Sequence, residues 1–413
     1  MNRRVVITGC GLVSSIGNSC DEVLASLKQN RSGIEHVPEW EAFGCKSLVA
    51  GTIKLPDVDS LRRDFGQKAR FMDIAALYSL ICAEEAITGS GIDRNDLAGE
   101  RTACIAGSGF SSSEPYRQAL DRVDGRVKRI GPFEVTRSMA SSVSANLSAF
   151  YGIKGRSYSI SSACATSLHN IGHAYELIKN GSCDVALTGG AEEVSPVFTC
   201  MFDGMRKVLS SGFNDEPHRA SRAYDKDRDG FVISGGGGMV VLEEYERAKA
   251  RNAPIYAEII GFGTSTDGHD IVQPDPEGTG CYRCMDVALK DAQCLPSAIN
   301  YVNTHGTSTP IGDLAEAAAI RKIFGSQPVR ISSTKSLTGH GIGATGAQEL
   351  IYCLLMMKES FVTASVNIEN RDPIFDDLNI VTRNEYCELD TVMTNSFGFG
   401  GTNGSLILKK VTQ

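Results

Sequence analysis

No apolar run in the 413-residue sequence approaches the roughly 20 residues that cross a bilayer as a helix. Arg3 and Arg4 precede a β-branched stretch at 5–8, but Gly9 and Gly11 interrupt it before it reaches the length of a signal-peptide core. The sequence therefore predicts a cytoplasmic protein with no membrane span.

The sequence also lacks an excess of positive charge. Its 41 Lys and Arg residues are outnumbered by 49 Asp and Glu residues, which gives a formal net charge of −8 at pH 7. Binding to nucleic acid requires a concentrated positive field, so we expect no nucleic-acid partner. With 42% hydrophobic and 22% charged residues, the composition is that of a folded protein.

A disulfide framework is not expected either. The 13 cysteines are odd in number and spread from Cys10 to Cys387, and a chain of this length does not need such bridges. A reducing compartment is the simpler interpretation. Cys281 and Cys284 have the spacing of a redox or zinc pair, but no second pair or nearby histidine completes a site, so no metal is expected.

One cysteine stands out by its local sequence. A β-favouring run at 157–162 leads directly to Cys164, and a helical pattern then continues to a stop at Asn180 and Gly181. At a helix N-terminus, free N–H groups and the macrodipole favour thiolate over thiol, which makes Cys164 the best candidate nucleophile. The alternative is a buried structural cysteine in a packed turn.

The second half of the chain resembles the first. The strand at 257–263 closes on Gly-x-Gly as 5–11 does, and 331–336 resembles 160–165, each followed by a helix start. Strands alternate with helices, which predicts a mainly parallel α/β sheet.

We therefore expect two similar halves, residues 1–250 with the cysteine and residues 251–413, related by a pseudo-twofold axis. In that arrangement the turn at Cys164 lies close to the turn at 335–340.

Three further turns follow predicted strands, at 303–310, 335–341 and 395–403. Ligands of open α/β sheets bind beyond the carboxyl ends of strands, so these turns and Cys164 are expected to share one crevice. A thiolate there can hold an acyl group as a thioester. The imidazoles of His305 and His340 could stabilise an enolate, and backbone N–H groups could bind a tetrahedral oxyanion.

These turns, taken together, resemble the signature set of elongating β-ketoacyl-acyl-carrier-protein synthases, and the resemblance extends from Val5 to Leu408. The matching motifs are Ser162-Ala163-Cys164-Ala165-Thr166-Ser167, His305-Gly306-Thr307-Ser308-Thr309, Lys335-Ser336-Leu337-Thr338-Gly339-His340 and Asn395-Ser396-Phe397-Gly398-Phe399-Gly400-Gly401-Thr402-Asn403. The run Ser159-Ile160-Ser161-Ser162 is most similar to the bacterial type I enzyme.

The resemblance implies a duplicated thiolase-like fold, five-layered α-β-α-β-α, in a homodimer. The implied reaction is decarboxylative Claisen condensation of an acyl thioester with malonyl-acyl-carrier protein in fatty acid elongation. It needs no cofactor beyond the phosphopantetheine arm of acyl carrier protein.

The resemblance also implies roles for individual residues. Cys164 is the acylated nucleophile, His305 and His340 hold the malonyl thioester oxygen, Lys335 supports them electrostatically, and Phe399 gives the second oxyanion N–H. The remaining implied residues orient this network (Asp313, Glu316, Glu349), bind the phosphopantetheine arm (Thr307, Thr309) or gate the acyl pocket (Phe397).

The substrate-binding parts depart from the family pattern. Phe110 stands where the family usually has Gly or Ile, and we expect its ring to fill part of the acyl tunnel and favour short or unusual chains. Phe133 and Met139 resemble a segment that reaches across the dimer into the partner's pocket. Acyl carrier protein is acidic, and five basic residues are candidates for docking it: Lys68, Arg70, Arg126, Lys128 and Arg129. Gln67 and Gly125 depart from the family's usual basic residues there.

Other classes of protein share part of this set of residues. A thiolase would carry a second cysteine at 395–403, and a cysteine hydrolase needs neither a second histidine nor the lysine turn. A non-elongating chain-length-factor-like partner would lack the nucleophile. A ketosynthase subunit of a specialised polyene or polyketide pathway, paired with a second synthase-like subunit, stays open as an alternative.

Overall fold

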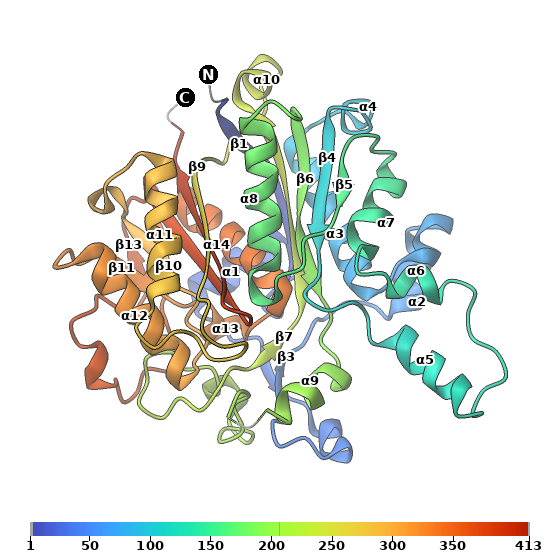
Figure 1. Ribbon diagram of the computed structural model, residues 1–413, viewed down its shortest axis with the longest axis horizontal. Coiled ribbons are helices and arrows are strands. Elements are labelled where there is room, and N and C mark those ends of the chain that lie inside the picture. Colours follow the sequence, from blue (N-terminus) through green and yellow to red (C-terminus); the bar gives the residue numbers. More distant parts are fainter. Residues whose placement is uncertain (1–2, 206, 412–413) are drawn as a thin grey trace.

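The computed structural model describes residues 3–205 and 207–411, which form an α/β fold around one ten-stranded mixed sheet (Figure 1). The strand order is β11-β10-β14-β15-β9-β1-β8-β6-β4-β5. Five strands come from the first half of the chain: β1 (Val5–Val13), β4 (Thr102–Gly107), β5 (Ser157–Tyr158), β6 (Val185–Glu192) and β8 (Gly236–Glu244). Five come from the second half: β9 (Ala257–Thr266), β10 (Tyr301–Asn303), β11 (Arg330–Ser332), β14 (Thr391–Gly398) and β15 (Thr402–Lys409).

The sheet is symmetric about its central pair. Strands β1 and β9 pair antiparallel, with Val5 opposite Ile259 and Ile7 opposite Ala257. Outward from this pair, the order β1-β8-β6-β4-β5 is repeated as β9-β15-β14-β10-β11, with the same parallel or antiparallel sense at each step. The predicted duplicated fold with pseudo-twofold symmetry is therefore confirmed.

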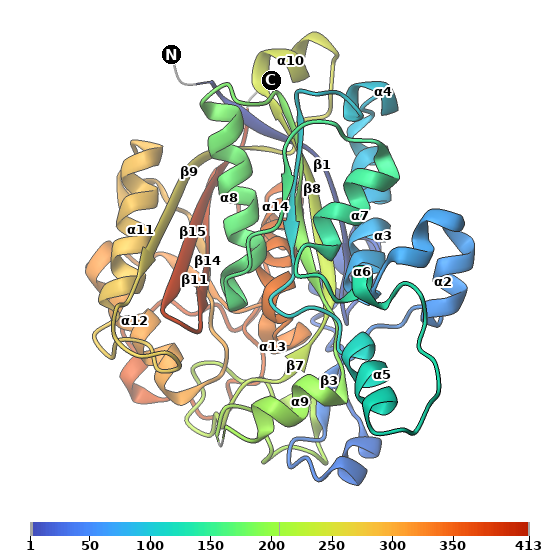
Figure 2. The ribbon, with the colours of Figure 1, turned by 45° about the vertical axis from the view of Figure 1, so that its right-hand side comes forward.

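Helices complete the predicted five layers. Helices α8 (Thr166–Lys179) and α14 (Thr345–Glu359) pack against each other between the two groups of strands (Figures 1 and 2). Helices α3 (Ile74–Ser90) and α7 (Ser142–Tyr151) cover the outer face of the first half. Helices α11 (Thr279–Ala292) and α12 (Pro310–Phe324) cover that of the second.

The two Gly-x-Gly motifs let these outer helices lie close to the sheet. A Cβ at Gly9 or Gly11 of β1 would lie 2.0 or 2.2 Å from a carbonyl oxygen of α3. A Cβ at Gly261 or Gly263 of β9 would lie 2.4 or 2.1 Å from a carbonyl oxygen of α11. Because such distances exclude any side chain, the glycines set the spacing between strand and helix in both halves.

The repeat differs from the prediction in one detail of register. In the first half, Cys164 lies in a 3-10 turn, η3 (Ala163–Ala165), that leads into α8. In the second half a short helix, α13 (Lys335–Thr338), is inserted before the equivalent turn, η6 (Ile342–Ala344), that leads into α14. The residue equivalent to Cys164 in this order is Gly343, so the predicted match of 331–336 with 160–165 is wrong beyond the strand end.

The segment between β4 and α7 extends away from the body of the molecule at the right of Figure 1, and it contains α5 (Glu114–Val123) and α6 (Glu134–Ser138). Helix α9 (Pro196–Asp203) lies below the sheet in the same view. The other elements are α1 (Cys20–Gln29), β2 (Ile34–His36), η1 (Pro38–Phe43), β3 (Val49–Gly51), α2 (Val58–Asp64), η2 (Gln67–Phe71), α4 (Arg94–Leu97), η4 (Pro217–Arg219), β7 (Ile233–Ser234), α10 (Tyr245–Ala250), η5 (Pro296–Ala298), β12 (Phe361–Val362), η7 (Pro373–Phe375) and β13 (Glu385–Tyr386).

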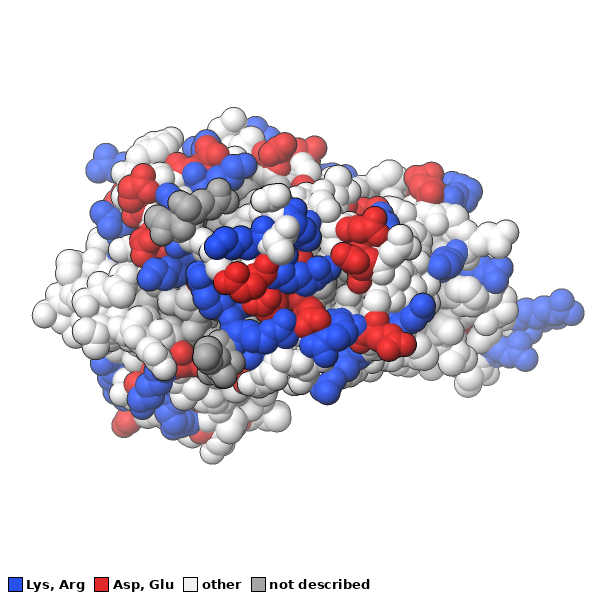
Figure 3. All heavy atoms as spheres, turned by 90° about the horizontal axis from the view of Figure 1, so that it is seen from above, with Lys and Arg blue, Asp and Glu red and all other residues white. Residues whose placement is uncertain are grey.

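The end of the molecule that carries both termini has basic and acidic side chains side by side (Figure 3). Asp184 accepts hydrogen bonds from both Arg3, at 2.8 Å, and Arg101, at 2.6 Å. Arg4 pairs with Glu258 of the central strand β9 at 2.6 Å. These ion pairs join segments that are far apart in the sequence. In the ranges that the structure describes, no helix is long and apolar enough to span a bilayer.

Candidate active site

The four predicted turns meet in one cavity of about 490 Å³. Cys164 enters it from the turn before α8, and His305 and Thr307 from the turn after β10. The turn before η6 contributes His340, and the hairpin between β14 and β15 contributes its residues at 397–399. The crevice predicted at the carboxyl ends of the strands is therefore present, and both halves of the chain build it.

Cys164 lies in a strained turn. Ala163, immediately before it, has a left-handed backbone with φ of 49°, which costs a residue with a Cβ roughly 1–2 kcal/mol. The turn places Cys164 just before the N-terminus of α8, where only 8% of the residue is exposed. The same conformation recurs at Ile342, with φ of 47°, before the second-half helix α14.

The protonation of Cys164 differs from the sequence-based expectation. Burial raises the pKa of its thiol to about 12, although the positive charge of Lys335 and the Phe399 N–H act in the opposite direction. The expected effect of the helix terminus, which favours thiolate over thiol, is therefore opposed by burial. The Cys164 proton must leave as the substrate arrives, and a neutral base close by is needed to take it.

Two such bases are close to the thiol. The Sγ of Cys164 and a ring nitrogen each of His305 and His340 all lie within 4.8 Å of one another. Burial, and secondarily the charge of Lys335, lowers the pKa of both imidazoles well below the usual value, so both are neutral at physiological pH. Their rings meet edge to face, with centroids 5.2 Å apart.

His340 is held in one orientation. Its Nδ1 lies 3.1 Å from the hydroxyl of Thr345, at the start of α14. If that hydroxyl donates to Nδ1, the proton of the neutral ring sits on Nε2. Nε2 is buried and has no hydrogen-bond partner among the described residues, so a ligand in the cavity is what it can bond.

Lys335 lies behind the histidines and not in the cavity wall. Its ammonium donates to Glu349 at 2.6 Å, and both side chains are 1% exposed. Burial raises the pKa of Glu349 to about 7, while the lysine charge and its hydrogen bond act against that rise. A buried pair of this kind fixes geometry, and losing one partner would leave the other charge uncompensated.

Two further predicted carboxyl groups hold the backbone of the His305 turn. Glu316 accepts from the N–H groups of His305 and Gly306, both at 2.9 Å. Asp313 accepts from the Ser308 N–H at 3.1 Å and faces the Arg228 guanidinium at 3.6 Å. Both are buried, and burial raises both pKa values, that of Asp313 to about 7.

Phe399, the predicted second oxyanion donor, lines the cavity together with Cys164. Its backbone N–H acts to lower the pKa of the Cys164 thiol. A Cβ at Gly398 would lie 2.8 Å from the Ser162 carbonyl oxygen and 3.2 Å from the Cys164 nitrogen. The absence of a side chain at Gly398 therefore lets the hairpin lie against the cysteine turn, so that the N–H groups of Cys164 and Phe399 flank the thiol.

The predicted arm-binding threonines also line the cavity. The hydroxyls of Thr307 and Thr309 are 3.0 Å apart. Phe397 is another lining residue, and its ring lies 5.8 Å from that of His305.

Phe110, Phe133 and Met139 lie elsewhere. Among the described residues, the cavity wall includes Phe202 but none of these three. Phe110 stacks on Phe198 at 4.8 Å and meets Phe202 edge-on at 5.8 Å, so it backs the cavity wall. Phe133 packs on Phe71 at 4.9 Å beside α6.

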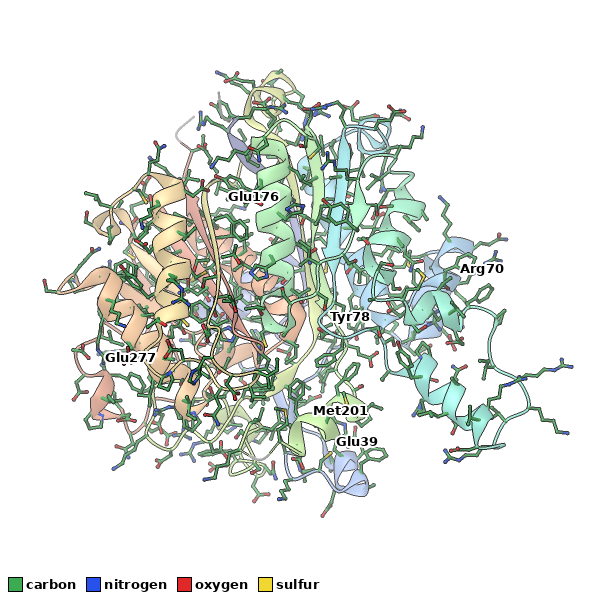
Figure 4. The ribbon with its side chains drawn as sticks, in the orientation of Figure 1. Glu39, Arg70, Tyr78, Glu176, Met201 and Glu277 are labelled. Carbon is green, nitrogen blue, oxygen red and sulfur yellow. The ribbon has the colours of Figure 1, made fainter. Side chains whose placement is uncertain are left out.

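The predicted docking residues fall into two groups. Three have partners within the chain: Lys68 donates to the carbonyls of Ala149 and Phe150, Arg70 stacks on Phe71 and Phe133, and Arg126 pairs with Asp121 and Asp124. Lys128 and Arg129 are exposed on the loop after α5. Figure 4 places Arg70 at the outer side of the molecule, near α2 and α6.

The sequence did not single out Glu192, at the end of β6. It accepts from the N–H groups of Gly109 at 2.8 Å and Gly343 at 3.1 Å, and so joins the loop before Phe110 to the start of α14. Burial raises its pKa to about 8. Its position two residues after Gly190, at a strand end, was the available signal.

The duplicated fold, with a thiol from one half facing two imidazoles from the other, defines a condensing enzyme of the thiolase superfamily, an acyltransferase. The β-ketoacyl synthase N-terminal domain model matches residues 2–248, and the C-terminal domain model matches 256–369. The chain belongs to the β-ketoacyl synthase family.

Similar proteins cover the whole chain. It is 51% identical over 411 residues to 3-oxoacyl-(acyl-carrier-protein) synthase 1 of Haemophilus influenzae and 48% identical over 412 residues to that of Escherichia coli K12, and each match covers 99% of both chains. A solved β-ketoacyl synthase from Burkholderia phymatum has a TM-score of 0.93 at 36% identity, covering 99% of this chain and 100% of that one. A solved ishigamide ketosynthase/chain length factor has a TM-score of 0.90 at 29% identity and covers 100% of both chains.

The raised pKa of Cys164 predicts a pH dependence. Because the pKa is about 12, alkylation by iodoacetamide should accelerate about tenfold per pH unit from about pH 7 to pH 9. Mass spectrometry of the peptide that contains Cys164 measures the rate. An unstructured peptide with one cysteine, whose thiol pKa is about 8.5, is the reference, and its rate should begin to level off within that range. A rate that is already constant from about pH 7 to pH 8 would instead mean a resident thiolate.

Proposed function

We propose that this chain is an elongating 3-oxoacyl-acyl-carrier-protein synthase of fatty acid synthesis. It condenses an acyl group held on Cys164 with malonyl-acyl-carrier protein, with loss of CO2. The observation that carries the proposal is the approach of the Cys164 sulfur and the nitrogens of His305 and His340 to within 4.8 Å of one another in one cavity. Residues 1–250 supply the nucleophile, and residues 251–413 supply the histidines.

The first half-reaction is acyl transfer. The sulfur of Cys164 attacks the acyl thioester carbonyl, and its proton passes to a neutral imidazole. The N–H groups of Cys164 and Phe399 bind the tetrahedral oxyanion, and such donors are worth roughly 3–4 kcal/mol each in other enzymes. The carbon–sulfur bond to the carrier then breaks, and the carrier thiol leaves with the proton.

The second half-reaction is decarboxylation and condensation. One N–H each from His305 and His340 bonds the malonyl thioester oxygen, and burial, with the Lys335 charge behind them, keeps both rings neutral. The bond to the carboxylate breaks, CO2 leaves and an enolate forms. Its carbon attacks the acyl carbonyl on Cys164, the bond to sulfur breaks, and the 3-oxoacyl thioester leaves. The Cys164 thiolate takes up one proton from solvent water to restore the thiol.

The cavity entrance suits the phosphopantetheine arm. The hydroxyls of Thr307 and Thr309 donate to polar groups of the arm, and Phe397 gates the passage between the arm and the acyl pocket. Asp313 and Glu316 fix the backbone that carries these groups and His305. No cofactor beyond the arm is needed for the reaction.

In this proposal, electrostatic attraction between basic side chains and the acidic carrier protein guides docking. All five basic residues are exposed, and Lys128 and Arg129 are the main candidates because the side chains of the other three already contact partners within the chain. Lys68, Arg70 and Arg126 then shape the surface beside them. Opposite charges steer an acidic partner and raise its rate of association.

The working form on this proposal is a homodimer in the cytoplasm. Strand β5 is the last strand of the sheet and is exposed, so its free edge can pair with a second copy. On α5, the apolar side chains of Tyr116, Leu120 and Val123 are 54%, 61% and 81% exposed. Phe133 and Met139, which lie outside this chain's own cavity, reach the partner's pocket in such a dimer.

A ketosynthase subunit of a specialised polyene or polyketide pathway is the second candidate. The structural similarity to the solved ishigamide ketosynthase/chain length factor, with a TM-score of 0.90, supports this candidate. The sequence identity to that protein is 29%, whereas the identity to the synthase 1 of Haemophilus influenzae is 51%. A non-catalytic partner is disfavoured because Cys164 and both histidines are in place. Purification as a homodimer active with malonyl-acyl-carrier protein separates the candidates.

Incubation with an acyl-acyl-carrier protein should add one acyl mass to the peptide that contains Cys164, and malonyl-acyl-carrier protein should then remove it as product. The reason is that the sulfur holds the acyl group between the two half-reactions. Intact and peptide mass spectrometry follow both steps, and Cys164→Ala is the control. Formation of a 3-oxoacyl product without an acyl group on Cys164 would contradict this mechanism.

Phe110→Gly should lengthen the acyl chains that the enzyme accepts. Removing the ring opens space behind Phe202, where Phe110 stacks on Phe198. The measurement is kcat/KM across acyl-acyl-carrier proteins of graded length. Phe43→Gly is the control, because Phe43 is 59% exposed on η1, away from the cavity wall. Unchanged chain-length preference in Phe110→Gly counts against this role.

A further inference from the structure

His169 lies on α8, just beyond Cys164, and links three segments of the site. Its Nδ1 is 2.7 Å from the hydroxyl of Ser162, two residues before the nucleophile. Its Nε2 is 3.1 Å from the carbonyl oxygen of Asn403 on β15 and 3.3 Å from the hydroxyl of Thr264 on β9. The side chain therefore connects the cysteine turn with the two strands of the second half that lie beside it.

The partners of His169 determine which ring nitrogen donates a hydrogen bond and which accepts one. Burial lowers the pKa of the ring, so it is neutral and has one N–H donor and one acceptor nitrogen. A carbonyl oxygen can only accept, so the proton sits on Nε2 and is donated to Asn403. Nδ1 is then the acceptor, and the Ser162 hydroxyl donates to it.

Each polar group of Ser162 takes part in a hydrogen bond. Its N–H donates to the Thr166 hydroxyl at 2.9 Å, and its carbonyl oxygen accepts from the Ala165 N–H at 3.0 Å. The Thr402 hydroxyl reaches both that carbonyl, at 3.2 Å, and the Phe399 carbonyl, at 3.3 Å. Ser162 and Thr402 therefore form the junction between the segments that carry the two oxyanion donors.

This junction is next to a strained residue. Ala163 keeps its left-handed φ of 49° between Ser162 and Cys164, and such a conformation persists only where the surrounding contacts fix it. The contact with His169 is the one that ties the Ser162 side chain to α8. Without it, the turn can relax toward an ordinary backbone, and the Cys164 N–H turns away from the oxyanion position.

We propose that His169 is a positioning residue for the oxyanion hole. It holds Ser162 and the β15 backbone in register, so that the N–H groups of Cys164 and Phe399 converge on one oxygen. This inference rests on the proposed function, and it predicts a selective defect. Acyl transfer passes through a tetrahedral oxyanion bound by the N–H groups of Cys164 and Phe399, whereas decarboxylation forms an enolate bound by the N–H groups of His305 and His340.

Three substitutions at His169 separate its two contacts. His169→Ala removes both contacts and should slow acylation of Cys164 by about tenfold to hundredfold, less than the loss of a whole donor. His169→Asn keeps an acceptor near the position of Nδ1 and should recover most of that rate. His169→Gln keeps a donor near Nε2 but loses the acceptor for Ser162, so it should stay slow.

The measurements are the rate of Cys164 acylation from an acyl-acyl-carrier protein and the rate of CO2 release from malonyl-acyl-carrier protein, each for every variant. CO2 release should stay within about twofold of wild type, and His36→Ala, an exposed histidine of β2, should change neither rate. Acylation of His169→Ala at the wild-type rate overturns the proposal. An equal fall in both rates also overturns it, because that is the result of a general structural role. Failure of the wild type to acylate Cys164 would instead refute the proposed function.

Discussion

The site depends on the packing of α8 against α14 across the pseudo-twofold axis. The two helices come so close that a Cβ at Gly346 would lie 2.6 Å from the Cβ of Leu168. The Ser167 hydroxyl, on the first turn of α8, accepts from the Ala347 N–H at 2.9 Å on the first turn of α14. Because both helices begin at this contact, the turn that carries Cys164 and the turn before α14 open into the same cavity.

Burial also sets the protonation states of the three catalytic side chains, Cys164, His305 and His340. The same desolvation raises the pKa of the Cys164 thiol and lowers those of His305 and His340, so the resting groups are neutral. Charge forms only during the reaction, as an oxyanion, a thiolate or an enolate, and each has N–H donors already facing it. The Lys335 ammonium, held by Glu349 behind the imidazoles, adds to the effect of burial in lowering the pKa of both rings. This is electrostatic preorganisation built from neutral groups.

The sequence predicted those parts of the site that are local in the chain. Cys164 and the histidines occupy turns after strands, and the Gly-x-Gly repeat revealed the duplication. Glu192 and His169 escaped prediction because their partners, such as Gly343 and Asn403, are 151 and 234 residues away. The burial that raises the pKa of the Cys164 thiol could not be predicted either. A helix start can be recognised in the sequence, whereas this burial arises only when both halves pack.

On the proposed mechanism, the N–H groups of both imidazoles are needed for decarboxylation, whereas one imidazole is enough to take the Cys164 proton in acyl transfer. The most direct test measures both half-reactions in His305→Ala and in His340→Ala, using mass spectrometry of the acylated Cys164 peptide and CO2 release from malonyl-acyl-carrier protein. Each variant is expected to acylate Cys164 still, because the remaining imidazole can take the proton of the thiol. CO2 release should fall by about a hundredfold or more, since a positioned N–H donor to an oxyanion is worth that much. Wild-type CO2 release in either variant would contradict this mechanism.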